Sequence, residues 1–178
     1  IVYRNFVFME YFKNELSDID AFIFDFDGVL TNNIVYLNQD GNEWVACSRS
    51  DGLAFDVLRK LGKPAYILST EINSVVKARG EKLNIPVLQG ISNKVEALKE
   101  LVDDKGYNLN KILYVGNEIN DYKAMQLCGY AVCPADSHIK VKQISKVVLK
   151  TAGGQGIVRE LLEDIFGIDF IEVLYGKY

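Results

Sequence analysis

The chain of 178 residues is 49% hydrophobic and 25% charged, a composition that suits a single domain with its own apolar core. Its formal net charge of −4 and its lack of a Lys/Arg-rich run argue against nucleic acid as a partner. No apolar run approaches the ~18 residues that a membrane span needs, and the first residues lack a secretory signal pattern, so we expect a cytoplasmic protein without membrane contact.

The chain opens with an aromatic-rich stretch that we interpret as a leader, residues 1–18, ahead of one domain at residues 19–178. The first predicted strand is Ala21–Phe24, and all of its residues are apolar. Such a strand is typical of a parallel sheet covered on both faces. The three cysteines lack CxxC spacing, so neither a disulfide framework nor a zinc site is predicted.

Two aspartates, Asp25 and Asp27, end this strand. Because side chains alternate along a strand, both carboxylates should point the same way while Phe26 points into the core. Two like charges this close need a cation or a shared proton to offset their repulsion. Gly28 then permits a tight turn, within which the Thr31 hydroxyl can hydrogen-bond. Aspartates that merely cap a loop are the alternative.

A β-hairpin is predicted at about residues 33–47. Its two β-prone runs, 34–37 and 43–47, are joined through Asp40-Gly41. The Asp-Gly pair tolerates the positive φ values that a tight β-turn requires. We expect a hairpin that stands off the main sheet to pack against another surface, either on this subunit or on a neighbouring one.

Strands and helices alternate along the rest of the chain. Strands are predicted at 65–69, 86–90, 111–115, 130–133 and 147–150, and helices at about 50–61, 74–83, 94–102, 120–128, 139–144 and 156–166. This alternation specifies an α/β fold, a Rossmann-like doubly wound parallel sheet with helices on both faces. No insertion is long enough for a separate cap domain. Ligands bind such sheets beyond the carboxyl ends of the strands.

Three further positions near strand ends carry polar groups suited to phosphoryl transfer: Ser69, Lys94 and the string GNEIND at 116–121. A hydroxyl with backbone amides can hold phosphate oxygens, a lysine can neutralise phosphoryl charge, and carboxylates can hold Mg²⁺. Taken singly, each has an ordinary explanation, such as a helix N-terminus that the macrodipole favours.

The string DFDGVLT at 25–31 resembles the first motif, DxDGxxT, of the haloacid dehalogenase superfamily, whose members are mostly Mg²⁺-dependent phosphohydrolases. Ser69, Lys94 and GNExxD match the order and spacing of the second, third and fourth motifs. The resemblance implies a HAD-like fold, with Asp25 as the nucleophile and Asp27 as the general acid/base.

The resemblance also implies the ligands. The expected phosphate-binding residues are Gly28, Ser69, Thr70 and Lys94. The expected Mg²⁺ ligands are Asp25, Asp27 through its backbone carbonyl, Asn117 and Asp121. One departure matters, because family members commonly carry Asp where this chain has Asn117. The site therefore loses one negative charge, and metal affinity should fall unless Glu118 or Asp121 compensates.

Within the superfamily, residues 20–166 resemble the capless branch that includes 3-deoxy-D-manno-octulosonate 8-phosphate phosphatase and the nonulosonate (KDN, sialic acid) 9-phosphate phosphatases. The hairpin, RSDG at 49–52 and GGQGIVRE at 153–160 carry this resemblance. Members of the branch are tetramers in which neighbouring subunits help to enclose the active site. A homotetramer is therefore implied, with the hairpin covering a neighbouring site.

The resemblance also indicates which sugar phosphate is the substrate. The eight-carbon enzymes typically carry Gly-Arg after the second-motif residue, whereas this chain has Thr70-Glu71. The nonulosonate enzymes carry Glu there, with Arg and Lys at the positions of Arg79 and Lys82. We therefore expect a sialic acid- or KDN-type 9-phosphate, contacted by Glu71, Arg79 and Lys82, with the 8-phosphate as the alternative. The alternative is that these three residues are ordinary charged side chains on an exposed helix face, without a role in binding the substrate.

Two other functions stay open at this point. The GNExxD string also resembles the phosphatase-like domain of acylneuraminate cytidylyltransferases, which suggests a non-catalytic oligomerisation domain of a CMP-sialic acid synthetase. The intact Asp25, Ser69 and Lys94 oppose that interpretation. A broad phosphomonoesterase without a dedicated sugar substrate is the third possibility.

Overall fold

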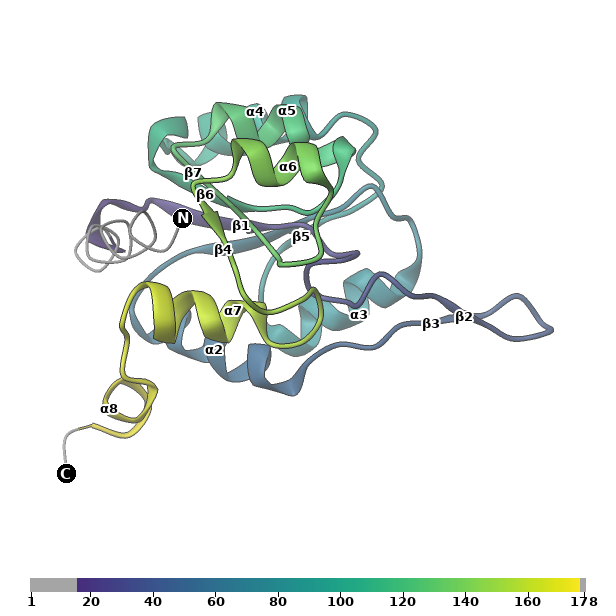
Figure 1. Cartoon of the computed structure of the whole chain (residues 1–178), viewed down its shortest axis with the longest axis horizontal. Helices are drawn as coiled ribbons and strands as arrows, with labels where there is room; N and C mark the ends of the chain where they lie inside the picture. The colour runs from purple at the N-terminus through teal and green to yellow at the C-terminus, as the bar shows by residue number, and fades with distance from the viewer. Residues whose placement is uncertain (1–15, 177–178) are drawn as a thin grey trace.

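The fold is built on a six-stranded sheet, and the computed structural model describes it over residues 16–176 (Figure 1). All strands run parallel in the order β5-β4-β1-β6-β7-β8. The strands are β1 Ala21–Phe24, β4 Ala65–Leu68, β5 Val87–Leu88, β6 Ile112–Val115, β7 Tyr130–Cys133 and β8 Val147–Val148. This arrangement confirms the doubly wound α/β fold predicted from the sequence.

Helices alternate with the strands of the sheet along the chain. They are α2 Arg49–Lys60, α3 Ser74–Leu83, α4 Lys94–Lys105, α5 Ile119–Leu127, α6 Ile139–Ile144, α7 Ile157–Glu160 and α8 Phe170–Tyr175, with short 3-10 turns η1 Leu16–Asp18 and η2 Leu109–Lys111. Most of the predicted leader, residues 1–15, lies outside the described residues. No helix in the described part of the chain is long and apolar enough to cross a membrane.

Two hydrophobic clusters cover the two faces of the sheet. Phe22 and Phe24 of β1 face the cluster formed with α2, α3 and α7, whereas Ala21 and Ile23 face the cluster formed with α4, α5 and α6. Figure 1 shows these two layers on opposite sides of the sheet. The central strand is thus buried on both faces, as its continuous apolar run predicts. Polar side chains that follow β1 therefore come to lie at the edge of the sheet.

The hairpin stands away from the sheet (Figure 1) and pairs over a shorter length than predicted. Strand β2 (Tyr36–Leu37) is antiparallel to β3 (Glu43–Trp44). The side chain of Asn38 accepts hydrogen bonds from the amides of Asp40 and Asn42, which closes the turn at 3.0 and 2.9 Å. Gly41 has a φ of 78° there, as a turn through Asp-Gly requires.

The C-terminal part differs from the prediction of one regular helix at 156–166. After α7 the chain widens into a π turn, η3 (Leu161–Ile165), in which the amide of Phe166 donates to the carbonyl of Leu161. Helix α8 was not predicted. Its signal was Asp169, whose carboxylate caps the helix by accepting from the amides of Ile171 and Glu172.

Candidate active site

The turn after β1 is a compact unit that presents both aspartates at the carboxyl edge of the sheet. The carbonyl of Phe26 accepts hydrogen bonds from the amides of residues 29–31 at 2.9 to 3.3 Å. The Thr31 hydroxyl accepts from the amide of Gly28 at 3.2 Å, and Gly28 has a φ of 77°. Asp25 is buried and Asp27 is half-buried. The tight turn expected from this string is therefore present, with Thr31 bonding inside it.

Lys94 lies between two carboxylates that come from distant parts of the chain. Its Nζ is 2.7 Å from Oδ1 of Asp25 and 2.7 Å from Oδ1 of Asp121. Asp25 follows β1, Asp121 belongs to the first turn of α5 after β6, and Lys94 is the first residue of α4. The three side chains are almost completely buried. The structure thus brings together three of the predicted site residues that are up to 96 positions apart in the numbering (25 to 121).

Both carboxylate oxygens of Asp121 accept hydrogen bonds. Besides Lys94, its Oδ1 accepts from the hydroxyl of Tyr114 at 3.0 Å, and its Oδ2 accepts from the amides of Asn117 and Glu118 at 3.0 and 3.2 Å. Tyr114 is fully buried in β6 and was missed from the sequence. The available signal was its place next to the GNE string, because a buried tyrosine hydroxyl usually finds a partner.

Burial and neighbouring charges shift the pKa values of the cluster in opposite directions. Burial raises the pKa of Asp25, the neighbouring charge of Asp121 raises it further, and Lys94 works against both. Burial alone would lower the pKa of Lys94, but the two carboxylates raise it. Burial and the nearby Glu71 also raise the pKa of Asp27. A raised pKa suits a carboxyl group that must deliver a proton.

Asn117 occupies the position where a metal ligand is predicted. Its Oδ1 is buried and has no hydrogen-bond partner within residues 16–176. Its side-chain amide lies directly over Gly28, where any Cβ would overlap it. A hard, unpartnered carbonyl oxygen beside the carboxylate-bearing turn fits a cation such as Mg²⁺. Among the described residues no group of three His, Cys, Asp or Glu side chains is arranged to hold a metal, so such an ion would need Asn117 and a backbone carbonyl in addition to a carboxylate.

The loop after β4 supplies the next predicted residues. Ser69 is buried and its Oγ accepts from the amide of Glu71 at 3.1 Å, while Thr70 is exposed. One carboxylate oxygen of Glu71 accepts from the amides of Ile72 and Asn73 at 2.7 and 2.8 Å. Glu71 is thereby fixed close enough to Asp27 to influence its pKa.

The other two predicted sugar contacts are not gathered with Glu71 in this chain. Nη2 of Arg79 donates to the backbone carbonyl of Ser48 at 2.7 Å, so this guanidinium points to the base of the hairpin. Lys82 is exposed in the last turn of α3, whereas Glu71 precedes the first turn. The hairpin itself reaches the loop after β4, since Nδ2 of Asn73 donates to Glu43 at 2.9 Å.

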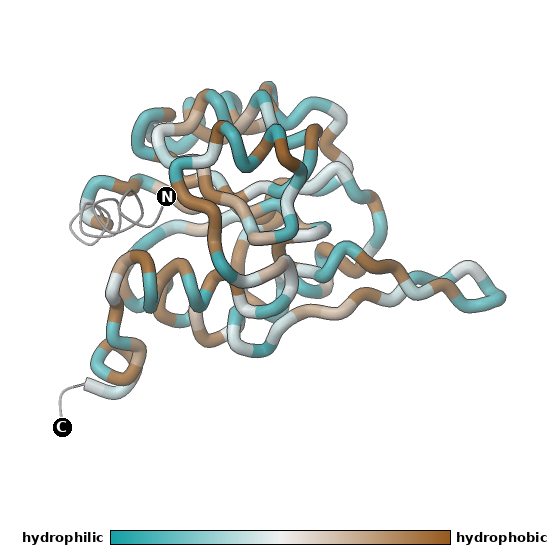
Figure 2. The backbone as a smooth tube through the Cα atoms, in the orientation of Figure 1, coloured by the Kyte–Doolittle hydropathy of each residue, from teal (hydrophilic) through white to brown (hydrophobic). Residues whose placement is uncertain are grey.

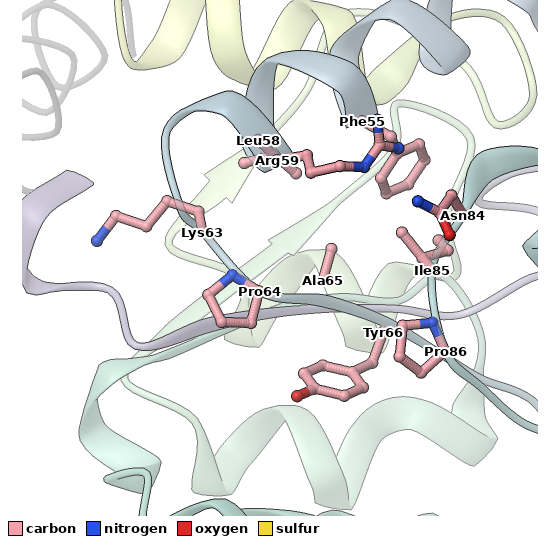
Figure 3. A pocket seen from close by; sticks show the side chains of 10 residues that line it. All are labelled: Phe55, Leu58, Arg59, Lys63, Pro64, Ala65, Tyr66, Asn84, Ile85 and Pro86. Atoms are coloured by element: carbon pink, nitrogen blue, oxygen red, sulfur yellow. The ribbon is translucent and has the colours of Figure 1, made fainter.

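A pocket of about 230 Å³ lies at the opposite edge of the sheet, around the start of β4 (Figure 3). Its two cationic side chains are already engaged. Nη2 of Arg59 donates to the carbonyl of Leu83 at 2.8 Å, and Nζ of Lys63 donates to the carbonyl of Ile19 at 2.8 Å. None of the predicted site residues lines this pocket, so it is separate from the carboxylate cluster.

The fold and this site define the class of protein. A doubly wound sheet without a cap, with paired aspartates after its central strand and a lysine held against the first of them, is the architecture of a haloacid dehalogenase-type hydrolase. The family model for haloacid dehalogenase-like hydrolases matches residues 60–161, and the chain belongs to this family.

A relative of known activity supports the same family. The chain is 30% identical over 148 residues to 3-deoxy-D-manno-octulosonate 8-phosphate phosphatase of Escherichia coli K12, covering 83% of this chain and 79% of the relative. These similarities confirm the predicted family and the predicted enzyme class, a phosphoric monoester hydrolase.

Solved structures give the same assignment. A HAD family hydrolase from Streptomyces avermitilis superposes with a TM-score of 0.84 at 43% identity, covering 86% of this chain and 88% of that one. The 3-deoxy-D-manno-octulosonate 8-phosphate phosphatase of Moraxella catarrhalis, solved with magnesium, phosphate and KDO, superposes with a TM-score of 0.84 at 28% identity, covering 89% and 92%.

Proposed function

We propose that this chain hydrolyses the phosphate monoester of an acidic sugar through an aspartyl-phosphate intermediate. The observation that carries the proposal is the buried contact of Lys94 with Asp25 at 2.7 Å. A lysine held against the nucleophile offsets its charge and can also meet the incoming phosphoryl oxygens. Asp27, next to Asp25 along the turn and only half-buried, is placed to exchange protons with substrate.

The reaction consists of two displacements at phosphorus. A carboxylate oxygen of Asp25 attacks phosphorus, the bond from phosphorus to the sugar oxygen breaks, and Asp27 gives its proton to that oxygen. Asp27 then removes a proton from the water that attacks the aspartyl phosphate, which releases inorganic phosphate and restores both carboxyl groups. Ser69, Thr70 and Lys94 hold the phosphoryl oxygens, and Gly28 lets the backbone of the turn approach them without a side chain.

Asp25, the backbone carbonyl of Asp27 and Oδ1 of Asn117 would hold Mg²⁺. When bound, the ion reduces the repulsion between the anionic nucleophile and the phosphate dianion. Asp121 was expected to be a fourth ligand, but its two oxygens already accept four hydrogen bonds. We therefore assign Asp121 the role of fixing Lys94.

Glu71 supports a nonulosonate 9-phosphate as the substrate. Two backbone amides fix one of its oxygens near Asp27, which leaves the other oxygen to accept a hydrogen bond from a sugar hydroxyl. The second candidate is 3-deoxy-D-manno-octulosonate 8-phosphate, which the relatives at 30% identity favour. Arg79 and Lys82 would reach the sugar carboxylate only after side-chain rearrangement or from another subunit.

The hairpin supports an oligomer, for which we propose a tetramer. Figure 2 shows hydrophobic residues along its arms and a hydrophilic tip. Leu37 is 68% and Trp44 67% exposed, values that suit residues covered by another chain. Ile72, Ile119 and Ile139, which are also exposed, lie in the segments that follow β4, β6 and β7. These exposed isoleucines could pack against the hairpin of a neighbouring subunit.

The test is steady-state phosphate release in Mg²⁺ from N-acetylneuraminate 9-phosphate, its deaminated analogue and 3-deoxy-D-manno-octulosonate 8-phosphate, with Asp25→Asn as the blank. We expect one 9-phosphate to be preferred and Glu71→Arg to shift the preference toward the 8-phosphate. A flat profile would favour a broad phosphomonoesterase. No release above the blank would favour a non-catalytic oligomerisation domain in which Asn117 marks a lost metal site.

A further inference from the structure

The loop between β8 and α7 packs backbone against backbone on the turn that carries the two aspartates. The amide of Gly154 donates to the carbonyl of Val29 at 2.9 Å. A Cβ on Gly153 would overlap the carbonyl oxygen of Gly28 and would lie 3.0 Å from the carbonyl oxygen of Thr31. The two glycines are therefore required by the closeness of this contact, since any side chain would push the turn away.

The ends of this loop are fixed by two buried carboxylates. Glu160 accepts from the amides of Lys150 and Thr151, each at 2.8 Å, which holds the start of the loop. Asp51 of α2 accepts from the amide of Val158 at 2.9 Å, which holds the helix that follows. Both carboxylates are less than 10% exposed, at 8% for Glu160 and 1% for Asp51. A loop anchored at both ends gives the turn a firm support.

A second close contact is made to the turn. The side-chain amide of Asn117 fills the space where a Cβ of Gly28 would lie. Gly28, the residue after Asp27, is thus in close contact with both Asn117 and Gly153. Displacement of Gly153 would move Gly28 and with it the carboxyl group of Asp27.

We propose that Gly153 and Gly154 are positioning residues that set the place of Asp27, the proton donor of the first displacement. The inference rests on the proposed function. Asp25 depends less on this support, because its backbone amide is bonded to Val115 of the sheet at 2.9 Å and its carboxylate is held by Lys94. A shift of the turn should therefore impair proton delivery more than nucleophilic attack.

The leaving group separates these two effects. An alkyl phosphate needs a proton on its leaving oxygen, whereas the phenolate of p-nitrophenyl phosphate leaves without one. Since kcat/KM reports the steps up to loss of the leaving group, it isolates the first displacement. We expect Gly153→Ala to lower kcat/KM for the preferred sugar phosphate by about 10²-fold and that for p-nitrophenyl phosphate by less than about tenfold.

Gly52→Ala is the matched control, because a Cβ there would make only an ordinary contact, 3.9 Å from Leu83. It should leave both kcat/KM values unchanged. Glu160→Gln, which loses one of its two loop hydrogen bonds, should change the ratio in the same direction by a smaller factor, and it carries the test should Gly153→Ala fail to fold. An equal fall for both esters, or no change, would overturn the inference. A wild-type protein that hydrolyses neither ester would instead overturn the proposed function.

Discussion

The ammonium nitrogen of Lys94 lies 2.7 Å from the buried carboxylate of Asp25. It is also the cation that balances Asp121, so one lysine serves two carboxylates in an environment almost closed to water. The strength of such an arrangement depends on all its members, because loss of one partner leaves uncompensated buried charge.

Lys94→Met should therefore reduce both stability and activity. We expect the free energy of unfolding to fall by about 3–5 kcal/mol and kcat to fall by on the order of 10²-fold or more. Urea unfolding and phosphate release measure the two effects. Lys99→Met, at an exposed position of the same helix, is the control and should change neither. A Lys94→Met protein with wild-type stability would show that the ion pairs are not formed in solution.

Tyr114→Phe tests the support that the strand gives to Asp121. The hydroxyl donates to a carboxylate at 3.0 Å, and a hydrogen bond to a charged group contributes about 1.5–3 kcal/mol. Tyr66→Phe is the matched control, since its hydroxyl is 3.0 Å from the neutral hydroxyl of Tyr107 and should cost only about 0.5–1.5 kcal/mol. We expect Tyr114→Phe to be the more destabilising in urea and to lower kcat several-fold. Equal losses for the two variants would contradict a special role for Tyr114.

Much of the site could be predicted because the fold follows from simple patterns. The continuous apolar run of β1 and the regular alternation of elements specify a parallel sheet. The structure pairs β1 with β6, and the carboxyl ends of neighbouring parallel strands lie side by side, so Asp25 comes close to Asp121 in the helix after β6. The meeting of Lys94 with both follows from its place at the start of the helix between them.

Other features depend on three-dimensional detail that spacing does not encode. Arg79 lies one turn from the end of α3, and its guanidinium bonds to the carbonyl of Ser48 instead of joining Glu71. The resemblance predicts Asp121 as a metal ligand, whereas its bonds to Tyr114 and Lys94 depend on how β6 and α4 approach each other, which spacing does not show. Side-chain direction on a helix is settled by packing, not by sequence position.

Asn117→Asp tests the reduced charge of the proposed metal site. A carboxylate at this position would add a buried negative charge against the turn that carries both aspartates, so without Mg²⁺ the melting temperature should fall. With Mg²⁺ the added ligand should raise affinity about tenfold or more, equivalent to about 1.4 kcal/mol per factor of ten. Calorimetric titration with Mg²⁺ measures the affinity, and Asn120→Asp at an exposed site of α5 controls for net charge. Unchanged affinity would remove position 117 from the metal site.

The pKa of Asp51 predicts how the stability of the fold depends on pH, independently of catalysis. Burial raises the pKa of its carboxyl from 3.8 to about 6, although the amides of Val158 and Arg159 and the charge of Arg79 partly oppose the rise. The folded state therefore holds this proton more tightly than the unfolded state does. As the pH rises from about 4 through 6, the unfolded chain loses its proton first, and the folded state is destabilised by an amount on the order of 3 kcal/mol that is complete above pH 6.

Asp51→Asn should remove this dependence, because asparagine carries no charge and its oxygen can still accept from the amide of Val158 at the 2.9 Å position. We expect the melting temperature of the variant, relative to wild type, to be higher at pH 8 than at pH 4.5. Asp103→Asn, at an exposed position of α4, is the control and should show no such change with pH. A difference in melting temperature that is the same at both pH values would mean that Asp51 carries the same charge in the folded and unfolded states, and that its role is confined to holding α7 in place.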